Sequence, residues 1–126
     1  MHLIPSITIA LALAGIAQAA TPAPEATALT PEAAEAAVLE CHAQYAHRYA
    51  RRVEAVASEI AAGAFAACKP AMDAFEALVP AMAKEDARVA IGVGDAHAAE
   101  REIVTRFRED VRNATIDAVI RARAAP

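Results

Sequence analysis

Apolar side chains recur every three or four residues in the first half of the chain, a spacing that predicts an α-helix. The first such stripe is formed by Val38, Cys41, Tyr45, Tyr49 and Val53. Thr30, Pro31 and Glu32 precede it and predict the start of the helix. Thr can accept a hydrogen bond from a free backbone N–H, Pro loses no bond at the first helical position, and Glu faces the positive end of the helix dipole.

A second apolar series follows and contains a proline. Its members are Ile60, Phe65, Cys68, Met72, Phe75, Val79 and Met82. Pro70 lies inside this series, and a proline within a helix removes one hydrogen bond and clashes with the preceding turn. We therefore expect the helix to kink or break at Pro70, and we expect a further boundary at Pro80.

The helical pattern lapses between Lys84 and Asp95 and then resumes in a long final helix. Gly92 and Gly94 read as a flexible connector, and Asp95 is a candidate N-cap behind them. The apolar face predicted for the last helix consists of Ala99, Ile103, Phe107, Val111, Ala114 and Ala118. Its outer face carries two opposite-charge pairs at i,i+4 spacing, Glu102–Arg106 and Asp117–Arg121. Together, the stripes predict an all-α bundle of three or four helices.

The composition supports the helical class and indicates a thin core. Alanine, which favours helices and is depleted in sheets, accounts for 38 of the 126 residues, and there is no tryptophan. A small Ala-rich bundle of this kind usually needs a covalent link, a metal or a partner subunit. The net charge of −4 argues against a nucleic-acid partner, which usually leaves a basic footprint.

Residues 1–19 have the features of a cleaved secretory signal peptide. Residues 2–20 contain no Lys, Arg, Asp or Glu, and an apolar run ends just before Ala17-Gln18-Ala19. Small residues at positions −3 and −1 predict cleavage after Ala19, with Ala20 as the alternative. A membrane span needs about twenty apolar residues, and polar side chains interrupt that length here. We therefore expect no stable membrane anchor after cleavage.

The remainder of the chain divides into a short lead-in and one domain. Residues 20–29 include Pro22, Pro24 and two threonines, and are expected to be a flexible Pro/Ala/Thr segment. Residues 30–126 are expected to form a single helical domain. The protein is thus predicted to be exported, either periplasmic or secreted.

Cys41 and Cys68 are the only two cysteines, and an exported protein enters an oxidising compartment. In one straight helix they would lie roughly 40 Å apart, whereas a disulfide tolerates about 4.4–6.8 Å between Cα atoms. A helical hairpin over residues 31–69, turning near Glu54 and with Ser58 as the cap of its second helix, would bring them together. The alternatives are two buried free thiols or a bridge between two subunits.

Metal binding is the first functional hypothesis that the side chains suggest. Cys41, His42, His47 and His97 are residue types that bind Zn or Cu. His42 and His47 are five residues apart, which places them on different faces of a helix, and Cys41 in a disulfide is no ligand. A site formed by His42 and His97 from two helices is the remaining option. Otherwise, His42 and His47 are expected to be partly exposed residues of the helix surface.

The sequence contains no motif that indicates catalysis or a bound cofactor. The C-x-x-C-H attachment of c-type haem is absent, and so are H-E-x-x-H and G-x-S-x-G. We therefore expect a protein that is not an enzyme and has no cofactor.

The remaining hypothesis is partner binding. Two tyrosines and two arginines lie within two helical turns, and both residue types are enriched at interfaces: Tyr45, Arg48, Tyr49 and Arg52. The plainer interpretation is that the tyrosines cover the core with their hydroxyls in water. The leading hypothesis is an exported, non-enzymatic helical protein with a structural role or with protein contacts, to an unknown partner or to itself. The alternative is a small periplasmic metal-binding protein that uses His42 and His97.

Overall fold

A computed structural model describes residues 27–89 and 95–126, and these ranges contain helices and no strand. The helices are α1 (Pro31–Tyr49), α2 (Ala57–Ala67), α3 (Lys69–Glu76), α4 (Val79–Val89) and α5 (Ala96–Ala124). Because α2 and α3 share Cys68 as their common cap, they form one broken helix, so the fold is a four-helix arrangement. The predicted all-α class is confirmed. The predicted signal peptide lies outside the described residues.

Helix α1 begins as the sequence predicts. The Oγ1 atom of Thr30 accepts a hydrogen bond from the backbone N–H of Ala33 at 3.2 Å, and Pro31 occupies the first turn. This cap satisfies one of the backbone donors that a helix leaves free at its start.

The prolines set the boundaries in the middle of the chain. Helix α2 ends at Ala67 and α3 starts at Lys69, immediately before Pro70, so the expected break is present. Helix α4 starts at Val79, next to Pro80, which confirms the second predicted boundary. Although the apolar pattern lapses after Lys84, α4 continues to Val89. Both breaks follow from the hydrogen bond that proline cannot donate.

Helix α5 begins at the predicted cap, and its predicted apolar face packs on the core except at Ala114. The Oδ1 atom of Asp95 accepts a hydrogen bond from the N–H of His97 at 3.0 Å. Beyond Val111, the buried positions are Thr115 and Val119, whereas Ala114 is exposed. The buried line thus advances four residues at a time and drifts around the helix, because α5 packs against α4 near its start and against α1 and α2 further along.

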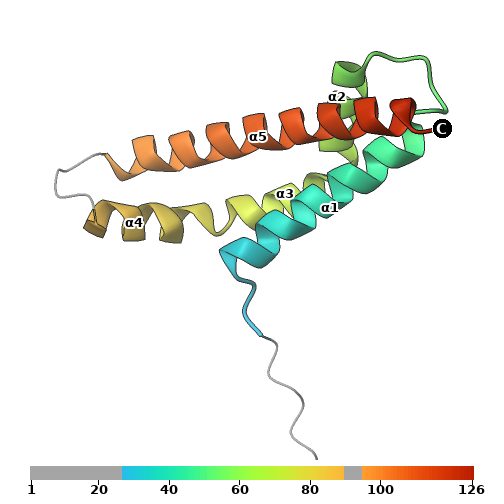
Figure 1. Cartoon of the computed structure of the whole chain (residues 1–126). Coiled ribbons are helices and arrows are strands. Elements are labelled where there is room, and N and C mark those ends of the chain that lie inside the picture. The colour runs from blue at the N-terminus through green and yellow to red at the C-terminus, as the bar shows by residue number, and fades with distance from the viewer. Residues whose placement is uncertain (1–26, 90–94) are drawn as a thin grey trace, which may run out of the picture.

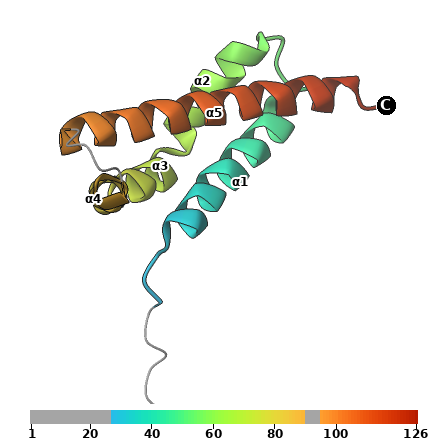
Figure 2. The same cartoon turned by 60° about the vertical axis from the view of Figure 1, so that its left-hand side comes forward.

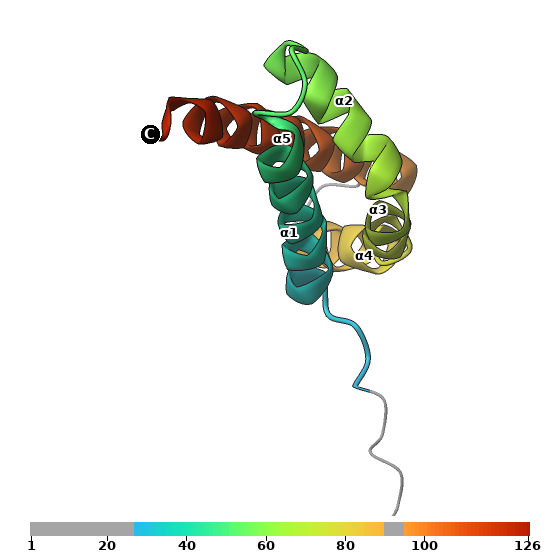
Figure 3. The same cartoon turned by 90° about the vertical axis from the view of Figure 1, so that its right-hand side faces the viewer.

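The long helix α5 is the element against which α1, α2 and α4 pack (Figure 1). It lies along one side of the molecule, while α4, α3 and α1 lie along the other, and Figure 2 shows α1 crossing α5 at an angle. Seen from the end that holds the C-terminus, α1 runs down below α5, whereas α2 begins above α5 and runs past it toward α3 (Figure 3). The C-terminal ends of α1 and α5 therefore meet at one end of the molecule.

The core consists of two small apolar clusters rather than one. The larger is centred on Phe75, whose ring lies 4.0 Å from that of Phe107 between centroids. The smaller contains Ile60 and Val119 together with buried alanines of α1. Alanine contributes six of the fourteen buried apolar residues among those described, which explains how the helices approach closely around so few large side chains.

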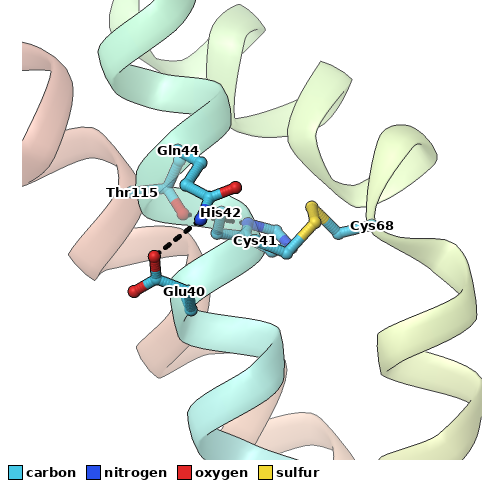
Figure 4. Close-up of a disulfide and its surroundings, with 6 residues drawn as sticks. All are labelled: Glu40, Cys41, His42, Gln44, Cys68 and Thr115. Carbon is cyan, nitrogen blue, oxygen red and sulfur yellow. Dashed lines mark hydrogen bonds between the residues drawn. A yellow bond between two sulfur atoms is a disulfide. The ribbon is translucent and has the colours of Figure 1, made fainter.

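The predicted disulfide is present and joins α1 to the junction of α2 and α3 (Figure 4). The Cα atoms of Cys41 and Cys68 are 5.9 Å apart, so the bridge lies within one chain and the intersubunit and free-thiol alternatives are wrong. The disulfide suggests a non-reducing environment for the protein. None of the helices in the described ranges has the length and apolar character needed to cross a membrane.

The hairpin turn differs in detail from the prediction. It occupies residues 50–56, and α2 starts at Ala57, so Ser58 lies inside the helix and is not its cap. The cap is Val56, whose backbone N–H donates to the carboxylate of Glu59 at 3.3 Å. A complete capping box has two hydrogen bonds, one accepted by the side chain of the cap residue and one donated by its backbone N–H. Only the second bond is present here, and it does not require a polar cap residue.

Candidate functional site

His42 is the most unusual polar residue of the core. It lies in the middle of α1 and is only 1% exposed, so the expectation that it lies on the helix surface is wrong. Its Nδ1 atom lies 3.0 Å from Oγ1 of Thr115 on α5 (Figure 4). Thr115 in turn donates its hydroxyl proton to the carbonyl of Val111 at 2.6 Å. The side chain of His42 on α1 is therefore linked to the backbone of α5 through Thr115.

These two bonds determine which nitrogen of His42 carries the proton. A hydroxyl has one proton, and that of Thr115 is donated to Val111, so its oxygen accepts from an Nδ1–H of His42. Nε2 is then unprotonated and bears a lone pair. Nε2 is also the one buried side-chain nitrogen or oxygen without a hydrogen-bond partner in the described part of the chain.

The surroundings of His42 disfavour its charged form. Phe65 of α2 packs against the imidazole with ring centroids 4.6 Å apart, in an edge-to-face arrangement. Burial lowers the pKa of His42 below its ordinary value, because desolvation penalises the imidazolium ion. The geometry thus describes a neutral, structural histidine at the interface of α1, α2 and α5.

We expect the folded protein to lose stability as the pH falls from about 6.5 toward 5. The folded state keeps His42 neutral, whereas the unfolded chain takes up a proton below about pH 6.5, so protons favour unfolding. The free energy of unfolding should fall by up to about 1.4 kcal/mol per pH unit from this group. Urea titrations at several pH values measure the effect.

The matched control is the exposed histidine five residues further along α1. The variant His47→Gln should keep the acid sensitivity between pH 6.5 and 5, whereas His42→Leu should lose it. An unchanged slope in His42→Leu would assign the pH dependence to other groups.

The structure does not bring His42 and His97 together, as a metal site formed by both side chains would require. The contact of His42 on α5 is Thr115, 18 residues after His97, and this separation corresponds to about 27 Å along a helix. His97 is exposed in the first turn of α5, where its Nδ1 lies 3.6 Å from the carboxylate of Glu100. No group of three or more His, Cys, Asp or Glu side chains within residues 27–89 and 95–126 is placed to hold a metal ion.

A surface groove of about 830 Å³ lies where the C-terminal ends of α1 and α5 meet. Alanines from both helices line it: Ala43, Ala118 and Ala122. Five longer polar or basic side chains also line it: Gln44, His47, Arg48, Arg52 and Arg121. We refer to it as the basic groove.

Two further arginines at the same end hold the two helices together. Arg51, just beyond α1, donates to the carbonyls of Ala122 and Ala125 at the end of α5, with 2.8 Å to the first. Arg123 of α5 reciprocates by donating to the carbonyl of Ala50, the C-cap of α1, at 2.7 Å. Cationic side chains on the last carbonyls of a helix are favourable, because these carbonyls lack intrahelical partners and form the negative end of the dipole.

The structure divides the predicted partner surface into two parts. Arg48 and Arg52 line the basic groove, whereas Tyr45 and Tyr49 stack on one another, with centroids 4.4 Å apart, and pack against the cluster around Ile60. Both tyrosines are half-buried. The sequence indicated the two arginines, but the contribution of Arg121 from the far end of the chain was missed, since only the tertiary structure places α5 beside them.

One of the two predicted ion pairs on α5 is present. Glu102 and Arg106 form a pair at 2.6 Å, whereas Asp117 and Arg121 form none in the described structure. The guanidinium of Arg121 is therefore not neutralised by its own helix.

No protein-family model, no curated protein and no solved structure matches the chain.

Proposed function

We propose that this protein is an exported, non-enzymatic helical protein that acts by binding another protein through the basic groove. The observation that carries the proposal is a set of three arginine side chains that line one groove and make no hydrogen bond or ion pair within the described structure: Arg48, Arg52 and Arg121. Charged side chains held near one another without partners repel each other, so this arrangement gains most when a partner supplies the opposite charge.

Two observations support the export of the protein to the periplasm or outside the cell. The disulfide requires a compartment that does not reduce it, and residues 1–19 have the apolar run and the small residues of a signal peptide. The mature protein would then begin at Ala20. We propose that the disulfide-bonded helices serve as a rigid framework for the basic groove.

Site-specific photo-crosslinking in the producing cell tests the proposal. A photoreactive amino acid is placed at Gln44, which lines the basic groove without contributing charge, and at exposed Ala74 on α3 as a matched control. We expect a discrete adduct of higher mass from position 44 in the exported fraction, and none from position 74. The adduct should disappear when Arg48→Glu and Arg52→Glu are added.

Two outcomes would overturn the proposal. One is the absence of an adduct at position 44, and the other is the same set of adducts from both positions. Retention of the protein in the cytoplasm with an intact N-terminus, seen by mass spectrometry of cell fractions, would overturn the export part.

A further inference from the structure

The charge of the basic groove differs from that of the whole chain. The protein has a net charge of −4, yet no Asp or Glu lines this groove. Arg51 and Arg123, at the same end of the molecule, are engaged with backbone carbonyls, whereas Arg48, Arg52 and Arg121 have no partner in the described structure. Two arginines at this end therefore stabilise the fold, whereas three others have guanidinium groups that are free to pair with a ligand.

The groove is open and lies between two helices, so an extended chain segment can reach its lining. It combines small alanine side chains with long arginine side chains that come from α1, from the turn after α1 and from α5. A ligand there can contact arginines of both helices at once.

The side chains indicate the chemistry of the ligand. A guanidinium group presents a planar set of donors that matches a carboxylate with two parallel hydrogen bonds. Three arginines in one groove therefore favour a ligand that carries several carboxylates at spaced positions. Gln44, which already donates to Glu40 at 2.7 Å, adds a polar rim on the α1 side.

We infer that the basic groove binds an acidic segment of a partner protein, whose Asp or Glu carboxylates pair with Arg48, Arg52 and Arg121. This inference rests on the proposed function and specifies the class of partner. Because the contacts are charge pairs at an accessible surface, the affinity depends strongly on salt, and association is accelerated by the opposite charge of the partner.

Fluorescence anisotropy with a labelled peptide of alternating Glu and Ala tests this inference on the oxidised, purified protein. We expect saturable binding that weakens as the salt concentration rises, and no binding of the matched Gln/Ala peptide. Each of Arg48→Gln, Arg52→Gln and Arg121→Gln should weaken binding about ten-fold, the effect of losing one good charge-assisted contact. Arg112→Gln, an exposed arginine of α5 outside the groove, is the matched control and should bind like the wild type.

The three groove variants should remain folded, because these side chains are exposed and make no contact that holds the helices together. Circular dichroism and the melting temperature check this. Equal loss of binding in Arg112→Gln would show that only the overall charge matters and would overturn the inference.

Other ligands of the same charge are separated by three further measurements. Competition by inorganic phosphate that is as effective as competition by unlabelled Glu/Ala peptide would overturn the inference in favour of a phosphate site. Tighter binding to vesicles of anionic lipid than to the peptide would overturn it in favour of a membrane surface. Self-association that the three variants abolish, seen by analytical ultracentrifugation, would overturn it in favour of a second copy of this chain.

The failure of the inference can be distinguished from the failure of the proposed function. An adduct at position 44 in the cell combined with no binding of the Glu/Ala peptide would overturn the acidic partner and support binding of another protein. Peptide binding with no adduct in the cell would support the chemistry of the groove and overturn the proposed function.

Discussion

Loss of the Cys41–Cys68 disulfide is expected to lower the free energy of unfolding by about 3.5 kcal/mol. The bridge closes a loop with a sequence separation of 27 residues and ties α1 to the junction of α2 and α3. In the loop-entropy account, it restricts the unfolded chain far more than the folded one. Domains of this size have total stabilities of about 5–15 kcal/mol, so the loss is a large fraction.

The measurement is thermal unfolding of the double variant Cys41→Ala/Cys68→Ala against the oxidised wild type. The melting temperature should fall by about 15–25 °C, the shift that corresponds to this free energy in a domain of about 100 residues. Wild-type protein treated with a reductant is the control and should unfold near the double variant. Similar melting temperatures for the oxidised and the reduced wild type would contradict the role of the bridge as a staple.

The second large effect is expected from Phe75→Ala, at about 3–5 kcal/mol. Phe75 is only 1% exposed and is the largest fully buried side chain among the described residues. It packs in the larger cluster with Val38 of α1 and Val111 of α5, and against the ring of Phe107. Its removal therefore leaves a cavity where α1, α3 and α5 meet.

Urea titration measures this effect, with Leu39→Ala on α1 as the control. Leu39 is 41% exposed, so its truncation should change the free energy of unfolding much less, by about 0.5 kcal/mol or less. Equal losses in the two variants would show that the cluster around Phe75 does not dominate the core.

The two effects are related through the composition of the chain. A core in which alanine supplies six of the fourteen buried apolar residues has few large contacts, so each of them contributes a large share of the stability. The disulfide compensates for this shortage at the junction of α2 and α3, next to Met72 of the cluster around Phe75. Because the reduced protein starts with a smaller free energy of unfolding, we expect Phe75→Ala to unfold a larger fraction of the reduced protein than of the oxidised protein.

Local features of the fold could be predicted because their causes are local. Thr30 and Asp95 act as caps because a short polar side chain reaches the free N–H groups of the following turn. Pro70 and Pro80 mark helix boundaries because proline cannot donate a hydrogen bond in any context. The intrachain pairing of Cys41 with Cys68 follows from the presence of only two cysteines, and the chain length between them then requires a hairpin.

Predictions failed where two distant segments determine the result. From the sequence we predicted that His42 lies on the surface and that Ala114 belongs to the apolar face of the last helix. In the structure, His42 is buried against α5, where the hydroxyl oxygen of Thr115, 73 residues away, accepts a hydrogen bond from its Nδ1–H. No periodicity within either helix contains that information.

By itself, the sequence determined the helical class, the caps, the breaks at the prolines and the single possible disulfide, since each depends on backbone chemistry within a few residues or on the count of cysteines. Only the tertiary structure decided how the arginines divide between two roles. Arg51 and Arg123 donate to the terminal carbonyls of the opposite helix, while Arg48 of α1 and Arg121 of α5 line the same groove. The physical reason is that helix propensity and capping act over one or two turns, whereas the basic groove exists only because two helix ends, about seventy residues apart in the chain, are packed together.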